Sequence, residues 1–158
     1  MIWGRLRVGG AAGRVFRLAS LFTHTQTGPD PMILFTAADL IWGSRIKRTG
    51  ESLGLSCRPV RSVAMLEDRL GEGGVTGLVL DLDVMELAES LVARLRGEEA
   101  GPAERAIRII AFGPHVRTDL FERIREAGAD EVMTRGAFDR TLPDLLLGLA
   151  TSASSDQM

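Results

Sequence analysis

One apolar run constrains this chain most strongly: the segment GLVLDLD at positions 77–83, which ends in carboxylates. A continuous apolar run bounded by turn-forming residues is typical of a central parallel strand that is covered on both faces. In an open α/β sheet, ligands and chemistry lie at the carboxyl ends of the strands. Asp81 is therefore placed where a reactive or metal-binding aspartate would lie. The first expected strand, 32–36, ends instead in Ala37 and Ala38, so neighbouring acids that could assist such chemistry are missing.

The composition indicates a single globular domain with no evident preference for nucleic acid or membranes. The 158 residues are 45% hydrophobic and 25% charged, and the net charge of −2 gives no electrostatic footprint for nucleic acid. No apolar run approaches the ~18 residues that a membrane-spanning helix needs. We therefore expect no membrane partner and a cytoplasmic location. The single cysteine, Cys57, excludes an internal disulfide, and its place in a predicted strand indicates a buried, inert thiol.

The charge is unevenly distributed along the chain. Residues 1–31 carry four arginines and one acid, a net charge of +3, whereas the rest of the chain carries −5. This first segment has no helical or strand period. It is interpreted as a basic disordered arm that contacts a partner, as an arginine-rich targeting peptide, or as residues placed ahead of a native start by gene calling. The sharp onset of patterned sequence at Met32 favours the last of these. The polar residues 151–158 are expected to form a disordered tail.

From Met32 onward, short apolar runs alternate with longer stretches of helical period. Strands are expected at 32–36, 55–60, 76–81, 107–112 and 130–134. Helices are expected at 38–53, 63–71 and 85–96, then from Arg117 or Thr118 to the terminating glycine Gly128. Residues 97–105 are expected to form a polar loop. The last helix, within 138–150, is expected to open near Thr141, which would place Pro143 in the first turn, where proline is tolerated.

This alternation predicts an α/β fold with a parallel sheet and helices on both faces. Pro59 lacks an N–H donor, so the second strand suits the edge of the sheet. Right-handed crossovers leave few topologies, and the strand order 2-1-3-4-5 is the natural one among them. We therefore expect a flavodoxin-like, three-layer α/β/α sandwich over residues 32–150, in which the ends of strands 1, 3, 4 and 5 meet at one pocket.

Three motifs, in this order and at this spacing, resemble the receiver (CheY-like) domains of bacterial response regulators over about residues 32–150. They are the strand that ends at Asp81, the turn EAGAD at 126–130 and the segment TRGAF at 134–138. The resemblance implies that Asp81 stands at the position of the phosphoacceptor aspartate. In that family, Mg²⁺ held by an acidic pair after strand 1 assists phosphoryl transfer by neutralising charge on the phosphoryl oxygens.

The other functional positions of the family carry different residues in this chain. They are Ala37 and Ala38 for the acidic pair, Gly113 for the switch hydroxyl, Val132 for the switch aromatic, and Arg135 and Gly136 for the lysine and the proline that follows it. Mg²⁺ needs several oxygen ligands in strict octahedral geometry, and only one carboxylate aligns. We therefore expect a degenerate receiver, or pseudo-receiver, with no metal, no cofactor and no catalytic residues. Asp39, one residue after the alanines, could still turn inward and add a ligand.

The expected strand-end pocket combines Asp81 with five further residues, namely Asp39, Asp83, Gly113, His115 and Arg135. Asp81 and Arg135 are expected to pair, since a guanidinium group can bind a carboxylate through two hydrogen bonds. Asp83 is interpreted chiefly as a turn former. His115 is interpreted as a loop-ordering or helix-capping residue. A metal site with Asp39 and Asp81, a phosphohistidine and a pH sensor remain alternatives for it.

The leading functional hypothesis is a stand-alone signalling module of the two-component or phosphorelay type that is not an enzyme. It would act without phosphorylation, by binding a protein partner or a second copy of itself through about residues 117–150. The alternatives are a small-ligand or metal-binding protein that uses the strand-end pocket, and an atypical phosphoacceptor at Asp81. A formed pocket would favour the ligand-binding protein, whereas an Asp81–Arg135 pair that fills it would favour the pseudo-receiver.

Overall fold

A parallel five-stranded sheet in the order β2-β1-β3-β4-β5 forms the centre of the computed structural model, which describes residues 29–152. The strands are β1 (Met32–Phe35), β2 (Ser56–Pro59), β3 (Val75–Asp81), β4 (Arg108–Gly113) and β5 (Glu131–Thr134). This order confirms the predicted flavodoxin-like fold, and β2, which contains Pro59, lies at the edge as expected. The carboxyl ends of the parallel strands meet at one side of the sheet, which is where Asp81 lies.

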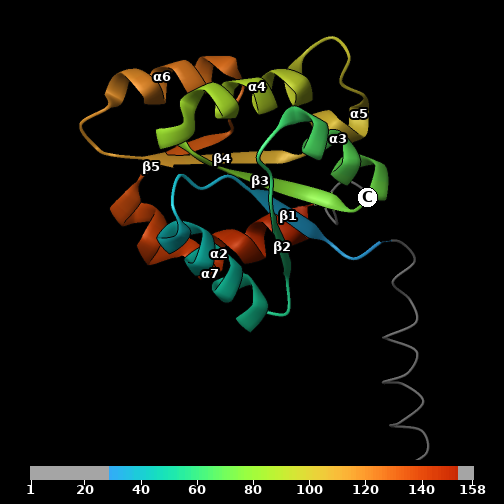
Figure 1. The fold of residues 1–158 in the computed structure, drawn as a ribbon, viewed down its shortest axis with the longest axis horizontal. Helices are drawn as coiled ribbons and strands as arrows, with labels where there is room; N and C mark the ends of the chain where they lie inside the picture. The colour runs from blue at the N-terminus through green and yellow to red at the C-terminus, as the bar shows by residue number, and fades with distance from the viewer. Residues whose placement is uncertain (1–28, 153–158) are drawn as a thin grey trace, which may run out of the picture.

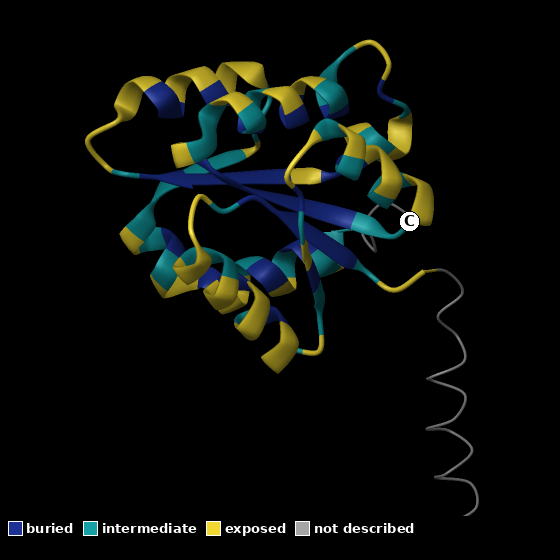
Figure 2. Cartoon of the chain, viewed as in Figure 1, coloured by how far each residue is buried: buried dark blue, intermediate teal, exposed yellow. Residues whose placement is uncertain are grey.

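Helices cover both faces of the sheet (Figure 1). The helices α2 (Leu40–Ser52) and α7 (Arg135–Thr151) lie on one face, and α3 (Val63–Glu72), α4 (Met85–Arg96) and α6 (Thr118–Ala127) lie on the other. Each layer of helices buries its own apolar cluster against the sheet. Figure 2 shows the result as buried strands between helices whose outer faces are exposed.

The position of β3 at the centre of the sheet explains why its sequence is apolar without alternation. Successive side chains of a strand point to opposite faces, so Leu78 and Leu80 pack in the layer of α3, α4 and α6, while Val79 packs in the layer of α2 and α7. All three side chains are completely buried. A strand covered on both faces must be apolar at every position, as the run at 77–83 predicted.

The helix ends follow their local sequence signals in most places. Ser62 caps α3 by accepting a hydrogen bond from the backbone N–H of Met65 at 3.1 Å. Gly128 follows α6 with a φ of 128°, which side-chain-bearing residues rarely adopt, so the predicted terminating glycine is confirmed. Cys57 is buried and free, and burial followed by the charge of Glu51 raises the pKa of its thiol to about 11. The prediction of a buried thiol is therefore confirmed.

The last helix departs from the prediction. It begins at Arg135, directly after β5, and Pro143 lies in its interior instead of its first turn. The reason is that Thr134 caps the helix early, by accepting a hydrogen bond from the backbone N–H of Ala137 at 3.2 Å. The expected loop at 97–105 also contains a short helix, α5 (Pro102–Arg105), and a 3₁₀ turn, η1 (Leu82–Val84), follows β3.

The predicted arm, 1–31, and tail, 151–158, fall almost entirely outside the described residues, and they stay predictions. Among residues 29–152, the helices are too short or too polar to cross a membrane.

The close approach of β3 and α7 generates a prediction about stability. A Cβ atom at Gly77 would lie 2.8 Å from the Cβ atom of Leu149, which is buried in α7. We expect Gly77→Ala to lower the free energy of unfolding by about 1–3 kcal/mol, because the overpacked core must shift. Urea unfolding followed by circular dichroism measures this change.

The matched control is Gly148→Ala in α7, where no heavy atom outside the local helix backbone lies within 4 Å of the added Cβ. This variant should be more stable than the wild type by up to about 1 kcal/mol, because alanine favours helix. Equal stabilities for the Gly77→Ala variant and the wild type would contradict the packing described.

Candidate functional site

The carboxylate of Asp81 lies at the centre of the carboxyl edge of the sheet and is completely buried. Its Oδ2 atom accepts a hydrogen bond from the backbone N–H of Ala38 at 2.9 Å, and its Oδ1 atom accepts one from the backbone N–H of Asp83 at 3.0 Å. The backbone N–H of Asp81 donates in turn to the buried Thr36 hydroxyl at 2.8 Å. Both carboxylate oxygens are therefore engaged by the protein itself.

The local sequence accounts for this arrangement. The strand ends at Asp81 because its side chain caps η1, where the chain turns away from the sheet. Thr36 is the last buried residue before the turn into α2, and Ala38 lies in that turn. The carboxylate and the Thr36 hydroxyl thus tie the end of β1 to the end of β3. Sequence reasoning missed Thr36, which only its place at the end of a buried strand could have indicated.

Arg135, the first residue of α7, lies between two carboxylates. Its Nη2 atom donates to Oδ2 of Asp83, while its distance to Oδ1 of Asp81 is 3.8 Å, too long for a hydrogen bond. The expected ion pair between Arg135 and Asp81 is therefore present at long range, but the two hydrogen bonds expected within it are not formed. Asp81 is completely buried with both oxygens occupied, whereas the Asp83 carboxylate is partly exposed and within reach. Asp83 lies in the turn, as expected, and also anchors the arginine.

The electrostatics of the site follow from burial. Loss of water around Asp81 raises the pKa of its carboxyl group above the ordinary value, and the nearby charge of Asp39 raises it further. The hydrogen bond from Ala38 and the charge of Arg135 oppose this shift. The charged form of Asp81 is thus costly, and only backbone donors and one partly exposed arginine offset the cost.

Asp39 and His115 do not join Asp81 in a metal site. Asp39 is exposed and caps α2, accepting a hydrogen bond from the backbone N–H of Trp42 at 2.9 Å. His115 is exposed in the turn between β4 and α6. Among residues 29–152, the structure contains no cluster of three His, Cys, Asp or Glu side chains that could hold a metal ion. The alternative that combined Asp39, Asp81 and His115 in a metal site is not supported by this geometry.

Gly113 ends β4 beside Asp81, and the space in front of it is filled. A Cβ atom there would lie 3.1 Å from the Cβ atom of Leu82 and 3.2 Å from a ring carbon of Phe121. Both side chains are buried. A residue larger than glycine would require them to shift by a few tenths of an ångström, so the position that the resemblance assigns to a switch hydroxyl is tightly packed. Sequence reasoning missed these two residues, although Leu82 directly follows Asp81 in the apolar run.

A group of three aromatic rings supports the first turns of α2 and α7. Phe112 in β4 stacks on Phe138 in α7 with ring centroids 4.1 Å apart and planes 7° apart. Trp42 in α2 contacts both rings, with centroid distances of 5.2 and 5.8 Å. Such pairs add packing energy beyond the area that they bury. They hold the turn of α7 that carries Arg135 against the sheet.

No protein-family model and no curated protein matches this sequence. Solved structures do match. A signal receiver domain of a DNA-binding response regulator from Colwellia psychrerythraea is 21% identical, with a TM-score of 0.58, and the match covers 75% of this chain and 99% of that one. A signal receiver domain of a histidine kinase from Syntrophus aciditrophicus is 21% identical, with a TM-score of 0.62, over 79% and 91%.

A third similar structure is a response regulator from Burkholderia pseudomallei, which was solved with a phosphorylated aspartic acid, a calcium ion and citrate. It is 15% identical, with a TM-score of 0.58, and the match covers 81% of this chain and 72% of that one. The chain has the fold of response-regulator receiver domains, so the predicted resemblance is confirmed at the level of the fold.

The buried carboxylate generates a prediction about pH. The pKa of Asp81 is raised in the folded state, so the protonated form favours folding. Its contribution to stability is fully present below about pH 4, the ordinary range of an aspartate, and is lost as the pH rises through the raised pKa. We expect the stability of the wild type relative to Asp81→Asn to fall as the pH rises through the raised pKa of Asp81.

Urea unfolding of both proteins between about pH 4 and pH 8 measures this difference. The charged groups that influence Asp81 include Arg135 and Asp39. Asp39→Asn is a matched control, since asparagine also caps helices and only the neighbouring charge is lost. In the Asp39→Asn background, the stability relative to the variant that also carries Asp81→Asn should again fall with rising pH, but by a smaller amount. A stability difference that stays constant or grows with pH would contradict the raised pKa.

Proposed function

We propose that this protein is a receiver-fold signalling module of the two-component or phosphorelay type that acts in the cytoplasm by binding a protein partner, without phosphorylation. It is a binding protein and not an enzyme. The observation that carries the proposal is the state of Asp81, whose buried carboxylate already accepts hydrogen bonds from Ala38 and Asp83. The fold of the chain supports a receiver. The hydrogen bonds already made to both oxygens of Asp81 support a receiver that does not use phosphate.

Phosphorylation of Asp81 would disturb one of these two contacts. One carboxylate oxygen would form the bond to phosphorus, so it would have to give up or share its backbone donor. The phosphoryl oxygens would then need positive charge close by. Among residues 29–152, Arg135 is the cation paired with Asp81, and it is already engaged by Asp83. Ala37 and Ala38 offer no metal-binding side chains at the family's acidic positions.

The residues around Asp81 also favour a single conformation. Leu82 and Phe121 fill the space in front of Gly113, and Arg135 bridges η1 and α7 through Asp83. A conformational change needs a differential interaction that favours the second state. A group bound at Asp81 would have to open this packing first, so we propose that the module presents one constant surface to its partner.

The proposed partner is a protein, bound through the region at about 117–150 that contains α6, β5 and α7. The charges on α6 are mixed in sign and partly neutralised, as in the ion pairs Arg117–Asp119 and Arg123–Glu89. Nucleic-acid binding requires a continuous basic stripe, and membrane binding by a surface helix requires a basic amphipathic face. A mixed surface of this kind fits a protein partner better than either.

A titration with Mg²⁺ and then beryllofluoride, a mimic of a phosphoryl group, tests the proposal on the full chain. We expect no saturable change in the backbone amide shifts of Ala38, Asp81 and Asp83 at millimolar Mg²⁺, because the octahedral ligand set is incomplete. Two-dimensional NMR of the labelled protein measures this. Saturable shifts at Asp81 and Arg135 in the wild type would contradict the proposal and favour an atypical phosphoacceptor.

The matched control is the double variant Ala37→Asp, Ala38→Asp, which restores carboxylates after β1 and keeps the backbone donor at position 38. This variant should gain Mg²⁺-dependent shifts around Asp81. If the wild type and this variant respond to Mg²⁺ alike, the missing acids are not the reason for the expected silence.

A further inference from the structure

Two large apolar side chains at the start of α2 are almost fully exposed: Leu40 by 84% and Ile41 by 76%. Single exposed apolar residues are normal, but adjacent ones at the edge of a groove suggest a binding surface. In the described part of the chain, the other large exposed apolar residues, Val116 and Leu147, have no second exposed large apolar residue beside them. Packing within the described part of the chain therefore does not explain why the beginning of α2 is apolar.

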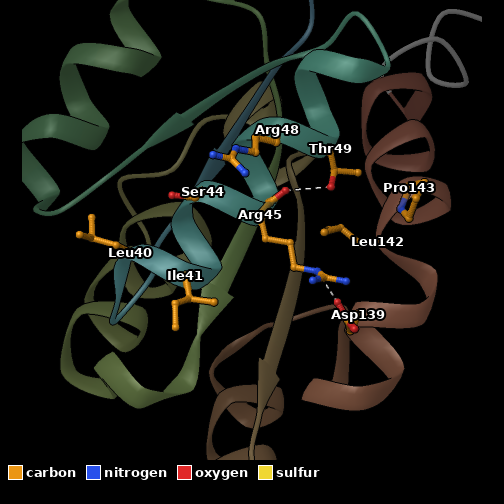
Figure 3. Close-up of a pocket in the computed structure, with 9 residues that line it drawn as sticks. All are labelled: Leu40, Ile41, Ser44, Arg45, Arg48, Thr49, Asp139, Leu142 and Pro143. Carbon is orange, nitrogen blue, oxygen red and sulfur yellow. Dashed lines mark hydrogen bonds and ion pairs between the residues drawn. The ribbon is translucent and has the colours of Figure 1, made fainter.

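Leu40 and Ile41 lie at one end of a groove between α2 and α7, which has a volume of about 630 Å³ (Figure 3). Leu142, which is buried, lies between the two helices, and the exposed Pro143 follows it on α7. Arg45 of α2 reaches across to form an ion pair with Asp139 of α7. A groove between two helices with apolar walls suits another helix, whose anchors recur at i, i+3 or i+4, and i+7.

The charge of the groove selects the partner. Arg45 and Arg48 line it from α2, and Asp139, the one carboxylate among its described lining residues, is already paired with Arg45. Lys47 is also on the exposed surface of α2. Within residues 29–152, neither Lys47 nor Arg48 has an ion-pair partner. A complementary partner therefore carries acidic residues beside its apolar anchors.

We infer that this groove is the docking site for an acidic amphipathic helix of another protein. Its apolar residues would pack on Leu40, Ile41 and Pro143, and its carboxylates would meet Arg48 and Lys47. The inference rests on the proposed protein-binding function. It adds a contact surface on the side of α7 that faces α2 to the proposed one at about 117–150.

Two other occupants fit the charge less well. Residues 1–28 carry four arginines and no acid, so this segment would bring positive charge to a positive groove. A second copy of the chain in a two-fold contact would place the same basic helix, α2, against itself. Both would add like charges at short range, which disfavours binding.

The probe for the test is a fluorescein-labelled peptide of about 15 residues, crosslinked to stay helical because short helices are marginal in water. Three versions of the peptide all carry leucines at i and i+7, with glutamates on both flanks. One has its middle leucine at i+3, one has it at i+4, and the third carries a fourth leucine at i+8. Fluorescence anisotropy with the full chain measures binding. We expect at least one version to bind saturably, with an affinity that falls as salt is added. A version with lysines in place of the glutamates should not bind.

Substitutions in the chain then locate the contact. Leu40→Glu and Arg48→Glu should each weaken binding by ~10-fold or more, since each removes a contact and adds a like charge. Both side chains are exposed, so neither variant should unfold the protein. Leu147→Glu is the matched control: it also places an acid at an exposed apolar position, on α7 outside the lining of the groove, and should leave binding unchanged.

Amide shifts on adding the peptide separate the outcomes. Shifts at 40–49 and 139–143 are expected. Shifts at 118–134 instead would overturn the groove but leave the protein-binding function intact. No binding by any acidic version, or equal binding of the lysine version, would overturn the inference, while the beryllofluoride titration would still decide the proposed function. Two other results would overturn the inference by assigning the groove to a different occupant. Groove shifts that depend on protein concentration would assign it to a second copy of the chain. Groove shifts that change with Arg14→Glu and Arg17→Glu would assign it to residues 1–28.

Discussion

Burial of one carboxylate organises the carboxyl edge of the sheet. A charged group removed from water is costly unless hydrogen bonds replace the lost solvation. The backbone donors of Ala38 and Asp83 meet this requirement only in part, since the pKa of the Asp81 carboxyl group stays raised by burial. The N–H of Asp81 itself donates to Thr36. These bonds fix the turn into α2 and the 3₁₀ turn after β3. The starting positions of α2 and η1, and through Arg135 that of α7, are therefore linked to the same buried group.

The surroundings of this carboxylate leave little freedom for a second state. Arg135 is held between Asp83 and Asp81, and the stacked rings of Phe112 and Phe138 fix the helical turn from which it extends. On the other side, Leu82 and Phe121 lie so close to Gly113 that a larger residue would require them to shift. Ala37, Ala38 and Gly113 supply neither metal-binding carboxylates nor a hydroxyl at these positions, which is why we propose constant binding. The basic groove between α2 and α7 gives such a module a surface that does not depend on the chemistry at Asp81.

The sequence predicted the fold because burial leaves a strong pattern in it. The uninterrupted apolar run of β3 and the proline of β2 were sufficient to place one strand at the centre of the sheet and the other at its edge. The site was harder to predict, because its contacts depend on distances between elements. Asp83 lies 52 residues from Arg135, and only the folded chain shows that it is the reachable carboxylate. The early start of α7 depends on the cap that Thr134 provides. The sequence did not reveal this start, because Pro143 was expected to lie in the first turn of the helix.

The central claim is that the carboxylate at the phosphoacceptor position does not accept phosphate. The most direct measurement is incubation of the full chain with acetyl phosphate and Mg²⁺, followed by intact-protein mass spectrometry, with Asp81→Asn as the reference. The account predicts no phosphoryl adduct on the wild type beyond the level found on the variant. A stoichiometric, acid-stable and base-labile adduct that disappears in Asp81→Asn would contradict it and would establish Asp81 as a working phosphoacceptor.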